Sequence, residues 1–277
     1  MRQGHAVPQR TIRGAASLEG IGVHTGARVR VHIAGAPPGA GIVFSRRDVP
    51  EGAAIRAAVG AVRSTQRGVT LGNGVTVVSV EHLMAAAAGL GIDNLRVEVD
   101  GPELPALDGS AAGYVAALEE AGIVEQEEVA RVIELGEAEV AVGQGHAVTR
   151  RAEDFRVSYT VDLPPPLGRQ VATADLAVFP TAIAPARTWG FADEAEALRA
   201  AGLARGAGLD NVLVIGAAGY LNPPRFSDEP ARHKILDLVG DLALLGARLQ
   251  GYVEVVRGGH VLHLVLAREI ARRWRDG

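Results

Sequence analysis

The sequence of 277 residues contains no cysteine. This absence excludes disulfide bonds and thiolate-ligated zinc sites, so any transition metal has to be held by histidine, aspartate or glutamate. A chain without cysteine also suits a reducing compartment, because disulfides persist mainly in oxidising ones. We therefore expect a cytoplasmic protein.

The chain also lacks the marks of membrane and nucleic-acid-binding proteins. No run approaches the roughly 18 uncharged apolar residues of a transmembrane helix. The segment Met1–His5 has neither the apolar stretch nor the cleavage site of a secretory signal. The net charge of -4 is the opposite of a basic nucleic-acid-binding surface. With 48% hydrophobic and 22% charged residues, the composition predicts a globular protein without a transmembrane segment or a nucleic-acid partner.

Hydrophobic periodicity in the first half predicts alternating strands and helices. Arg28–Ile33 and Leu95–Val99 alternate as half-buried strands do. Between them, Val80–Ala88 has the pattern of a short helix, and Ser79 is placed to cap its N-terminus. An alanine-rich helix is predicted at Ala111–Ala121.

The second half repeats this character after an acidic segment, Glu125–Glu128, which we interpret as a linker. The pattern predicts, in chain order, strands at Ala138–Val142 and Phe155–Val161, a helix at Ala231–Leu245, and strands near Gly251–Val256 and Val261–Leu266. We therefore predict the α+β class, with two similar two-layer domains at residues 1–125 and 130–277.

A polar stripe on the helix predicted at Ala231–Leu245 is the strongest candidate for chemistry. His233 and Asp237 stand four residues apart, so both face one side of the helix, about 6 Å apart along its axis. An imidazole and a carboxylate so placed can hold one divalent metal ion. Asp241 continues the stripe and could orient a histidine, while Lys234 adds a cation beside it. The ordinary alternative is a solvated polar surface.

Glu81 and His82 offer a second candidate pair. In the first turn of a helix, the helix dipole favours an ionised Glu81 and a neutral His82. These are the forms that a general base and a metal ligand need. The alternative is a helix start with a solvated glutamate and a packed histidine.

Two other segments could contribute to a site. His260 follows a Gly258-Gly259 turn and could act as a general acid beside a carboxylate, or could be an exposed turn histidine. His263 would face the opposite side of the strand predicted there, and we interpret it as structural. Thr188, within Arg187–Phe191, could donate to an oxyanion, or the segment could be a strand end with core aromatics. His24, in a glycine-rich turn, has little motif value.

Taken together, these segments resemble a known family, the UDP-3-O-acyl-N-acetylglucosamine deacetylases, zinc enzymes of lipid A biosynthesis. The resemblance extends from Gln9 to about Ala267, with the matches in the same order. The matching segments are Gly22–Gly26, Ser79–Leu83, Gly91–Asn94, Leu107–Ala111, Ala186–Phe191, Arg232–Asp237 with Gly240–Leu242, and Gly259–His260.

The resemblance implies a role for each candidate residue. By resemblance, the zinc ligands are His82, His233 and Asp237, the general base is Glu81, the protonated histidine near the leaving group is His260, its orienting residue is Asp241, the oxyanion donor is Thr188, and a further electrostatic contributor is Lys234. The same ligands would suit iron(II) as well as zinc. The family fold places helices between two sheets, and an inserted βαβ unit near 189–215 would form a tunnel for the acyl chain. Trp189, Phe191 and Arg257 are the expected substrate contacts, with Arg257 near the diphosphate.

Two departures from the family pattern bear on the substrate. Thr65–Gly68 is polar and charged where relatives often carry apolar residues, and Leu163 replaces a familiar phenylalanine that could offer an aromatic surface to uracil. The leading expectation is a monomeric enzyme that removes the acetyl group from a UDP-linked, 3-O-acylated sugar. The alternatives are a related zinc amidohydrolase for another N-acylated nucleotide-sugar and a non-catalytic metal-dependent binder of UDP-sugars.

Overall fold

A computed structural model describes residues 7–49 and 54–276 of the chain. Met1–His5, where the sequence predicts no secretory signal, lies outside the described residues. Within the described part, no helix has both the length and the apolar character needed to cross a membrane.

Two sheets of the same topology dominate the structure. The first contains, in spatial order, β2 (Ala15–Ile21), β3 (Arg28–Gly35), β9 (Leu95–Val99), β4 (Ile42–Arg46) and β5 (Ile55–Arg56). The second contains β12 (Ala138–Val142), β13 (Gly145–Arg150), β19 (Arg248–Val256), β14 (Phe155–Asp162) and β15 (Arg169–Asp175), while β11 (Val132–Glu134) pairs with another part of β19. The central strand of the first sheet, β9, is antiparallel to β3 and parallel to β4. In the same way, the central strand of the second sheet, β19, is antiparallel to β13 and parallel to β14.

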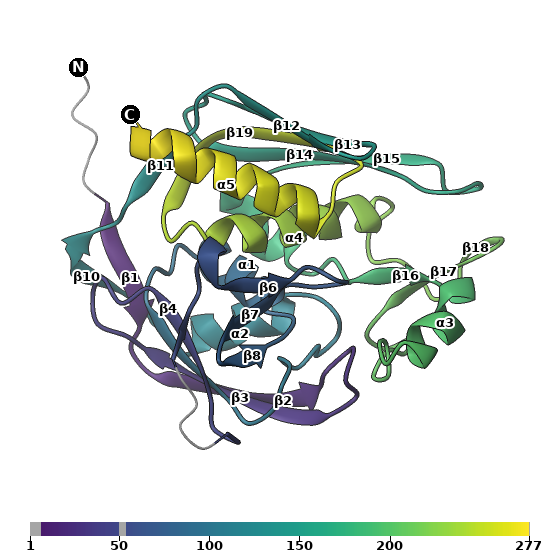
Figure 1. Ribbon diagram of the computed structural model, residues 1–277, viewed down its shortest axis with the longest axis horizontal. Coiled ribbons are helices and arrows are strands. Elements are labelled where there is room, and N and C mark those ends of the chain that lie inside the picture. Colours follow the sequence, from purple (N-terminus) through teal and green to yellow (C-terminus); the bar gives the residue numbers. More distant parts are fainter. Residues whose placement is uncertain (1–6, 50–53, 277) are drawn as a thin grey trace.

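Helices of the described part of the chain lie between these sheets (Figure 1). They are α1 (Glu81–Gly89), α2 (Ala112–Glu120), α4 (Glu229–Ala243) and α5 (His260–Asp276). In each half, one helix precedes the central strand and one follows it, so α1 corresponds to α4 and α2 to α5. The predicted α+β class, with helices sandwiched between two sheets, is confirmed.

Each half carries an inserted small sheet directly before its first helix. In the first half the insert contains β6 (Val62–Ser64), β7 (Thr70–Asn73) and β8 (Val75–Val77). In the second half β16 (Trp189–Phe191) and β17 (Leu213–Gly216) run parallel around α3 (Ala195–Ala200), and β18 (Gly219–Tyr220) completes the sheet. This βαβ unit projects from the side of the molecule (Figure 1). Short helical turns occupy Val59–Ala61, Leu176–Val178, Phe179–Ile183 and Ala192–Glu194.

The segment interpreted as a linker is ordered as a strand. Glu125–Glu128 lies within β10 (Ile123–Val129), which pairs antiparallel with β1 (Pro8–Ile12). The two halves are thus joined by a paired ribbon, and the domain limits of 1–125 and 130–277 stay a prediction.

The strand predicted near Val261–Leu266 is wrong, because this segment begins α5. His263, Leu266, Ala267 and Ile270 are buried at intervals of three to four residues, which is the helical period. Val261 and Leu262 differ in burial as neighbours on a strand would, but this alternation does not continue along the segment.

Close contact between α1 and α4 sets the position of the candidate site. Gly240 on α4 lies so near α1 that an added Cβ would be 2.1 Å from the backbone oxygen of Glu81. The polar stripe of α4 is therefore buried rather than solvated: His233 and Asp237 are each 2% exposed and Asp241 is 0% exposed. The alternative of a solvated surface is wrong.

Candidate metal centre

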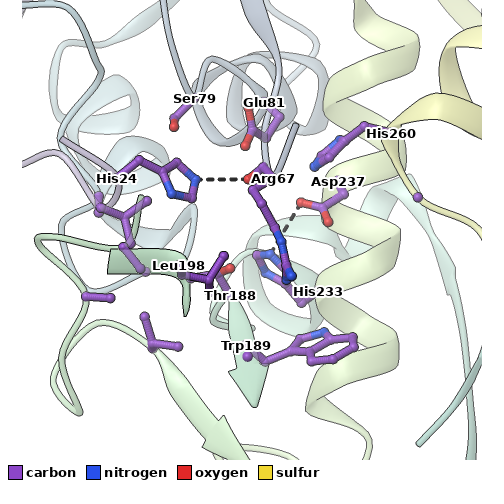
Figure 2. Close-up of a pocket in the computed structure, with 18 of the residues that line it drawn as sticks. His24, Arg67, Ser79, Glu81, Thr188, Trp189, Leu198, His233, Asp237 and His260 are labelled. Carbon is purple, nitrogen blue, oxygen red and sulfur yellow. Dashed lines mark hydrogen bonds and ion pairs between the residues drawn. The ribbon is translucent and has the colours of Figure 1, made fainter. Parts of the chain in front are cut away.

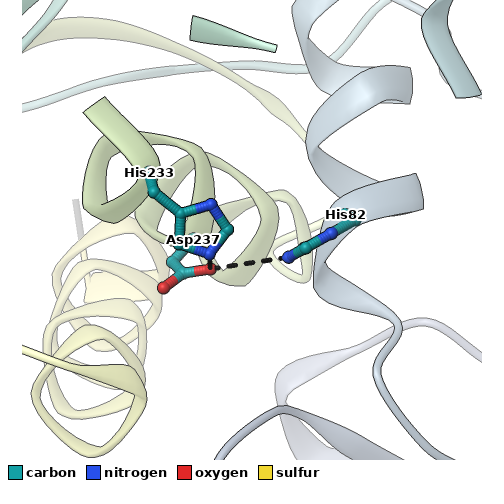
Figure 3. Close-up of side chains that lie close together, drawn as sticks. All are labelled: His82, His233 and Asp237. Atoms are coloured by element: carbon teal, nitrogen blue, oxygen red, sulfur yellow. Dashed lines mark ion pairs between the residues drawn. The ribbon is translucent and has the colours of Figure 1, made fainter. Parts of the chain in front are cut away.

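Three side chains from α1 and α4 converge at the contact between these helices (Figure 3). Nε2 of His233 lies 3.3 Å from Oδ1 of Asp237, and Nε2 of His82 lies 4.0 Å from the same oxygen. One ligand atom of each residue lies within 4.8 Å of the others. Two ligand atoms about 2.1 Å from a tetrahedral ion would be about 3.4 Å apart, so this cluster has the dimensions of a zinc site.

Hydrogen bonds outside the cluster fix the direction of each ligand atom. Nδ1 of His233 donates to the backbone oxygen of Ala186 at 3.0 Å, which leaves Nε2 free to accept a metal ion. The backbone of Ser110 likewise interacts with His82. Nζ of Lys234 donates to Oδ2 of Asp237 at 2.8 Å, so the other oxygen faces the imidazoles.

The ionisation states also suit metal binding. Burial lowers the pKa of His82 to about 3, with a further contribution from His233, so its ring is neutral. Burial likewise lowers the pKa of His233. For Asp237, burial is opposed by the charges of Lys234 and the histidines, which hold its pKa well below its usual range. Two neutral imidazoles and one carboxylate form the donor set of an open catalytic zinc site.

Glu81 is the first residue of α1 and lies beside the cluster (Figure 2). Its Oε2 accepts a hydrogen bond from the backbone N–H of Val69 at 2.9 Å, and the residue is only 5% exposed. Burial, reinforced by the charge of Asp237 and opposed by that of His260, raises the pKa of Glu81 to about 7. The alternative of a solvated glutamate is wrong, and the pKa near neutrality suits a group that accepts and returns a proton.

The predicted N-cap at Ser79 is also wrong. Val80 occupies the N-cap of α1 without a side-chain hydrogen bond. Ser79 has a φ of 58° and donates to Oε1 of Glu103 at 2.9 Å. Glu103 is 1% exposed and also binds the backbone N–H groups of His24 and Thr25 at 3.0 and 2.8 Å. The chain before α1 is thus held by a buried carboxylate that local patterns gave no reason to select.

His260 is the first residue of α5, and its side chain is 10% exposed. Its Nδ1 donates to Oδ2 of Asp241 at 2.8 Å. Burial opposes a charge on His260, but the carboxylates of Asp241, Asp237 and Glu81 outweigh it and raise its pKa to about 9. The ring is therefore protonated at neutral pH and is not an exposed turn histidine.

His263 was interpreted as a structural residue on a strand, but its helix places it beside His260. Its Nδ1 donates to the same Asp241 oxygen at 2.7 Å, and its Nε2 lies 2.8 Å from the hydroxyl of Tyr159. The sequence signal that identifies it is the spacing of three residues from His260, once α5 is assigned as a helix.

A cavity of about 700 Å³ extends from this cluster to the βαβ unit. Glu81, His82, His233, Asp237 and His260 lie at its polar end. Its other end is lined by apolar residues of the insert, including Leu198, Leu209, Val212 and Val214. The cavity therefore joins a charged site to an apolar channel (Figure 2).

The other predicted contacts also line this cavity. Thr188 is held through its backbone, which donates to Gly109 at 2.7 Å and accepts from Leu213 at 2.8 Å. Trp189 and Phe191 pack edge to face with ring centroids 5.8 Å apart. Both rings are half-buried in the cavity wall, so they are not simply core aromatics at a strand end.

Lys234 and Arg257 bring positive charge to the cavity. Nζ of Lys234 lies 5.6 Å from the centroid of the Trp189 ring and also donates a hydrogen bond to Asp237. Arg257 lines the cavity and is paired with Asp162, so a phosphate group would have to compete with that carboxylate. Leu163 is 7% exposed and offers no aromatic surface.

Arg67 lines the cavity and lies among the site residues (Figure 2). Its guanidinium is 3.0 Å from Oε2 of Glu194 in the turn before α3, which joins the inserts of the two halves. Nε2 of His24 donates to the backbone oxygen of Arg67 at 3.0 Å. The polar loop at Thr65–Gly68 therefore forms part of the cavity wall, and His24, which had little motif value in the sequence, supports it.

Comparison with known proteins agrees with this geometry. A family model described as UDP-3-O-acyl N-acetylglycosamine deacetylase matches residues 9–272. The chain belongs to this family. The resemblance noted in the sequence is thereby confirmed.

Several relatives named UDP-3-O-acyl-N-acetylglucosamine deacetylase are similar over nearly the whole chain. A protein of Myxococcus xanthus is 44% identical over 95% of this chain and 86% of its own length. A protein of Thermosynechococcus vestitus is 42% identical over 97% of this chain and 95% of its own length. A protein of Phenylobacterium zucineum is 46% identical over 96% of this chain and 95% of its own length. The site described above thus lies within the region that family members share.

Proposed function

We propose that the protein hydrolyses the acetamide of UDP-3-O-acyl-N-acetylglucosamine, in a zinc-dependent reaction that gives the free amine and acetate. The reaction would serve lipid A biosynthesis in the cytoplasm. The observation that carries the proposal is an acid–base pair, Glu81 and protonated His260, beside a three-ligand cluster at the polar end of an apolar channel. The names of the relatives support the same substrate.

His82, His233 and Asp237 would hold the zinc ion. When bound, zinc supplies Lewis acidity, which lowers the pKa of water and polarises an amide carbonyl. Iron(II) fits the same nitrogen and oxygen donors, because affinity alone does not select between these metals. The residues around the cluster then determine where protons move.

Glu81 is placed to take a proton from the attacking water. Its carboxylate accepts a hydrogen bond from Val69 on one oxygen, and the residue lines the cavity. The hydroxyl of Thr188 would donate to the oxyanion of the tetrahedral intermediate, and Lys234 would favour the same negative charge. Backbone hydrogen bonds hold Thr188 in the cavity wall, and Lys234 is held by its ion pair with Asp237.

The departing amine needs a proton when the carbon–nitrogen bond breaks. His260 carries one at neutral pH, and Glu81 has just received one from water. Both groups line the same end of the cavity, so the geometry allows either donor. In both cases the positive charge of His260 stabilises the developing oxyanion.

The substrate would extend along the cavity. The 3-O-acyl chain matches the channel lined by Leu198, Val212 and Val214, because burial of methylene groups there removes apolar surface from water. Trp189 and Phe191 would flank the sugar, and Arg257 would meet the diphosphate.

Acetate release is the direct test. Metal-free protein would be reconstituted with zinc and assayed on the acylated UDP-sugar with and without a chelator. We expect activity only with metal, and loss of at least about 100-fold in Glu81→Ala. Activity without metal, or full activity in Glu81→Ala, would contradict the mechanism.

A related zinc amidohydrolase with another N-acylated nucleotide-sugar is the second candidate. Arg67 in the cavity wall and the buried Leu163 favour it, because both change the expected substrate contacts. Turnover of acylated and non-acylated UDP-sugars distinguishes the two candidates. Equal turnover would favour the second, and tight binding without turnover would indicate a binding protein instead.

A further inference from the structure

Asp241 supports two imidazoles on a single carboxylate oxygen. Its Oδ2 accepts from Nδ1 of His260 at 2.8 Å and from Nδ1 of His263 at 2.7 Å. Its other oxygen is buried and has no hydrogen-bond partner among the described residues. The interactions of this carboxylate are therefore divided between two histidines, only one of which reaches the cavity.

Tyr159 fixes the tautomer of His263. Burial lowers the pKa of His263, against the effect of Asp241, so the ring is neutral. Because its Nδ1 carries the proton that is donated to Asp241, its Nε2 must accept, and the Tyr159 hydroxyl donates to it at 2.8 Å. Tyr159 and His263 are both 0% exposed, so no water replaces these bonds.

We propose that His263 is a positioning residue for the proposed hydrolysis: held by Tyr159, it fixes Asp241 and limits how strongly that carboxylate acts on His260. The inference rests on the proposed function. His263 does not line the cavity and acts only through Asp241. A support of this kind is needed because His260 follows Gly258-Gly259 and has no preceding side chain to anchor it.

The titratable groups around His260 come from three helices. They are Glu81 and His82 on α1, His233, Asp237 and Asp241 on α4, and His263 on α5, with Tyr159 of β14 behind them. Among these groups, His263 is the neutral histidine that donates to Asp241. Removing that donor makes Asp241 more basic, so it would hold the His260 proton more tightly.

The direction in which the His260 pKa moves distinguishes this role from a purely structural one. In His263→Leu, the proton of His260 should be lost at a pH higher by roughly one unit. Loss of packing would do the opposite, because an exposed His260 would return toward its ordinary, lower pKa. In His263→Asn, the side-chain amide can place an N–H near the position of Nδ1. His260 should then lose its proton at the same pH as in the wild-type protein.

The experiment has two readouts on zinc-loaded protein. The pH titration of the His260 ring is followed by NMR without substrate, and kcat and KM are measured for the acylated UDP-sugar. For His263→Leu we expect the upward shift, a fall in kcat of about tenfold or more, and little change in KM. His263→Asn should restore both readouts, and Tyr159→Phe should lie between wild type and His263→Leu.

Leu266→Ala is the matched control, since Leu266 is buried on the same helix and its side chain has no group that could donate a hydrogen bond to Asp241. It should lower Tm without moving the His260 titration. An unchanged or lowered His260 pKa in folded His263→Leu, or failure of His263→Asn to restore it, would overturn the proposal. If wild-type protein did not hydrolyse the substrate, the proposed function would fail, while the NMR titration would still decide the role of His263.

Discussion

Gly240 and Glu81 touch through their backbones, because a Cβ at position 240 would lie 2.1 Å from the carbonyl oxygen of Glu81. This contact holds α1 directly against α4. His82 is the next residue on α1, and Asp237 lies one turn before Gly240 on α4. The missing side chain therefore sets the distance between candidate metal ligands from opposite halves of the chain.

Gly240→Ala should separate these helices. The added methyl group meets backbone, which cannot rotate away, so we expect a loss of about 1–3 kcal/mol in the free energy of unfolding. Zinc affinity should fall as well, because His82 would move away from Asp237. Denaturant unfolding and zinc titration measure the two effects. Gly136→Ala is the control, because a Cβ there meets nothing within 4 Å, and it should leave zinc affinity unchanged.

Local periodicity predicted most elements of the fold. Leu95–Val99 has the observed bounds of β9, and the helix predicted at Ala231–Leu245 is α4 at Glu229–Ala243. The error at Val261–Leu266 arose because β-branched and alternating residues there resemble a strand over six positions. Only the burial of Ala267 and Ile270 further along shows the helical period.

The arrangement of the site residues was harder to predict from local sequence patterns. The spacing of His233 and Asp237 placed them on one helix face, but their burial depends on the packing of α1, which no local pattern describes. The residue types offered His82 as a further metal ligand, but only the packing of α1 against α4 brings it to 4.0 Å from Asp237. The hydrogen bond from His263 to Asp241 was missed because its segment was assigned to the wrong secondary structure.

The pH dependence of kcat/KM should be bell-shaped. Activity should rise as Glu81 ionises around its pKa of about 7, and a bound cation should move this limb to lower pH because it favours the carboxylate. Activity should fall as His260 loses its proton around its pKa of about 9. His260→Gln should remove the fall at high pH, and a fall that persists unchanged would exclude His260 as its origin.

Metal binding should stabilise the folded protein. The three ligands are assembled only in the folded state, so zinc at 100 times its Kd should add about 2.7 kcal/mol to the free energy of unfolding. Thermal unfolding with zinc and with a chelator measures this difference. His233→Ala should abolish it, whereas His146→Ala, which changes an exposed histidine on β13, should leave it intact.

The Arg67–Glu194 pair should affect substrate binding more than stability. The two side chains are 46% and 39% exposed, so the pair contributes at most about 1 kcal/mol to folding. Arg67→Met replaces a charge in the cavity wall with an apolar side chain, and KM for the acylated substrate should fall. Arg96→Met is the control, because Arg96 is 60% exposed, pairs with Glu98 and does not line the cavity. A raised KM in Arg67→Met would instead indicate that Arg67 binds the substrate.

Filling the apolar channel should discriminate between substrates by chain length. Leu198 on α3 lines the cavity, so the larger side chain in Leu198→Trp would occupy space that the acyl chain needs. We expect KM to rise about tenfold or more for a long 3-O-acyl chain, because each methylene excluded from the channel forfeits about 0.8 kcal/mol. KM for a short-chain analogue should change little. Ala197→Trp, on the exposed face of the same helix, controls for the bulk of tryptophan. A short acyl chain cannot reach the ring added on α3, so only the long-chain substrate should be affected. Equal effects of Leu198→Trp on both substrates would therefore mean that the acyl chain does not enter this channel.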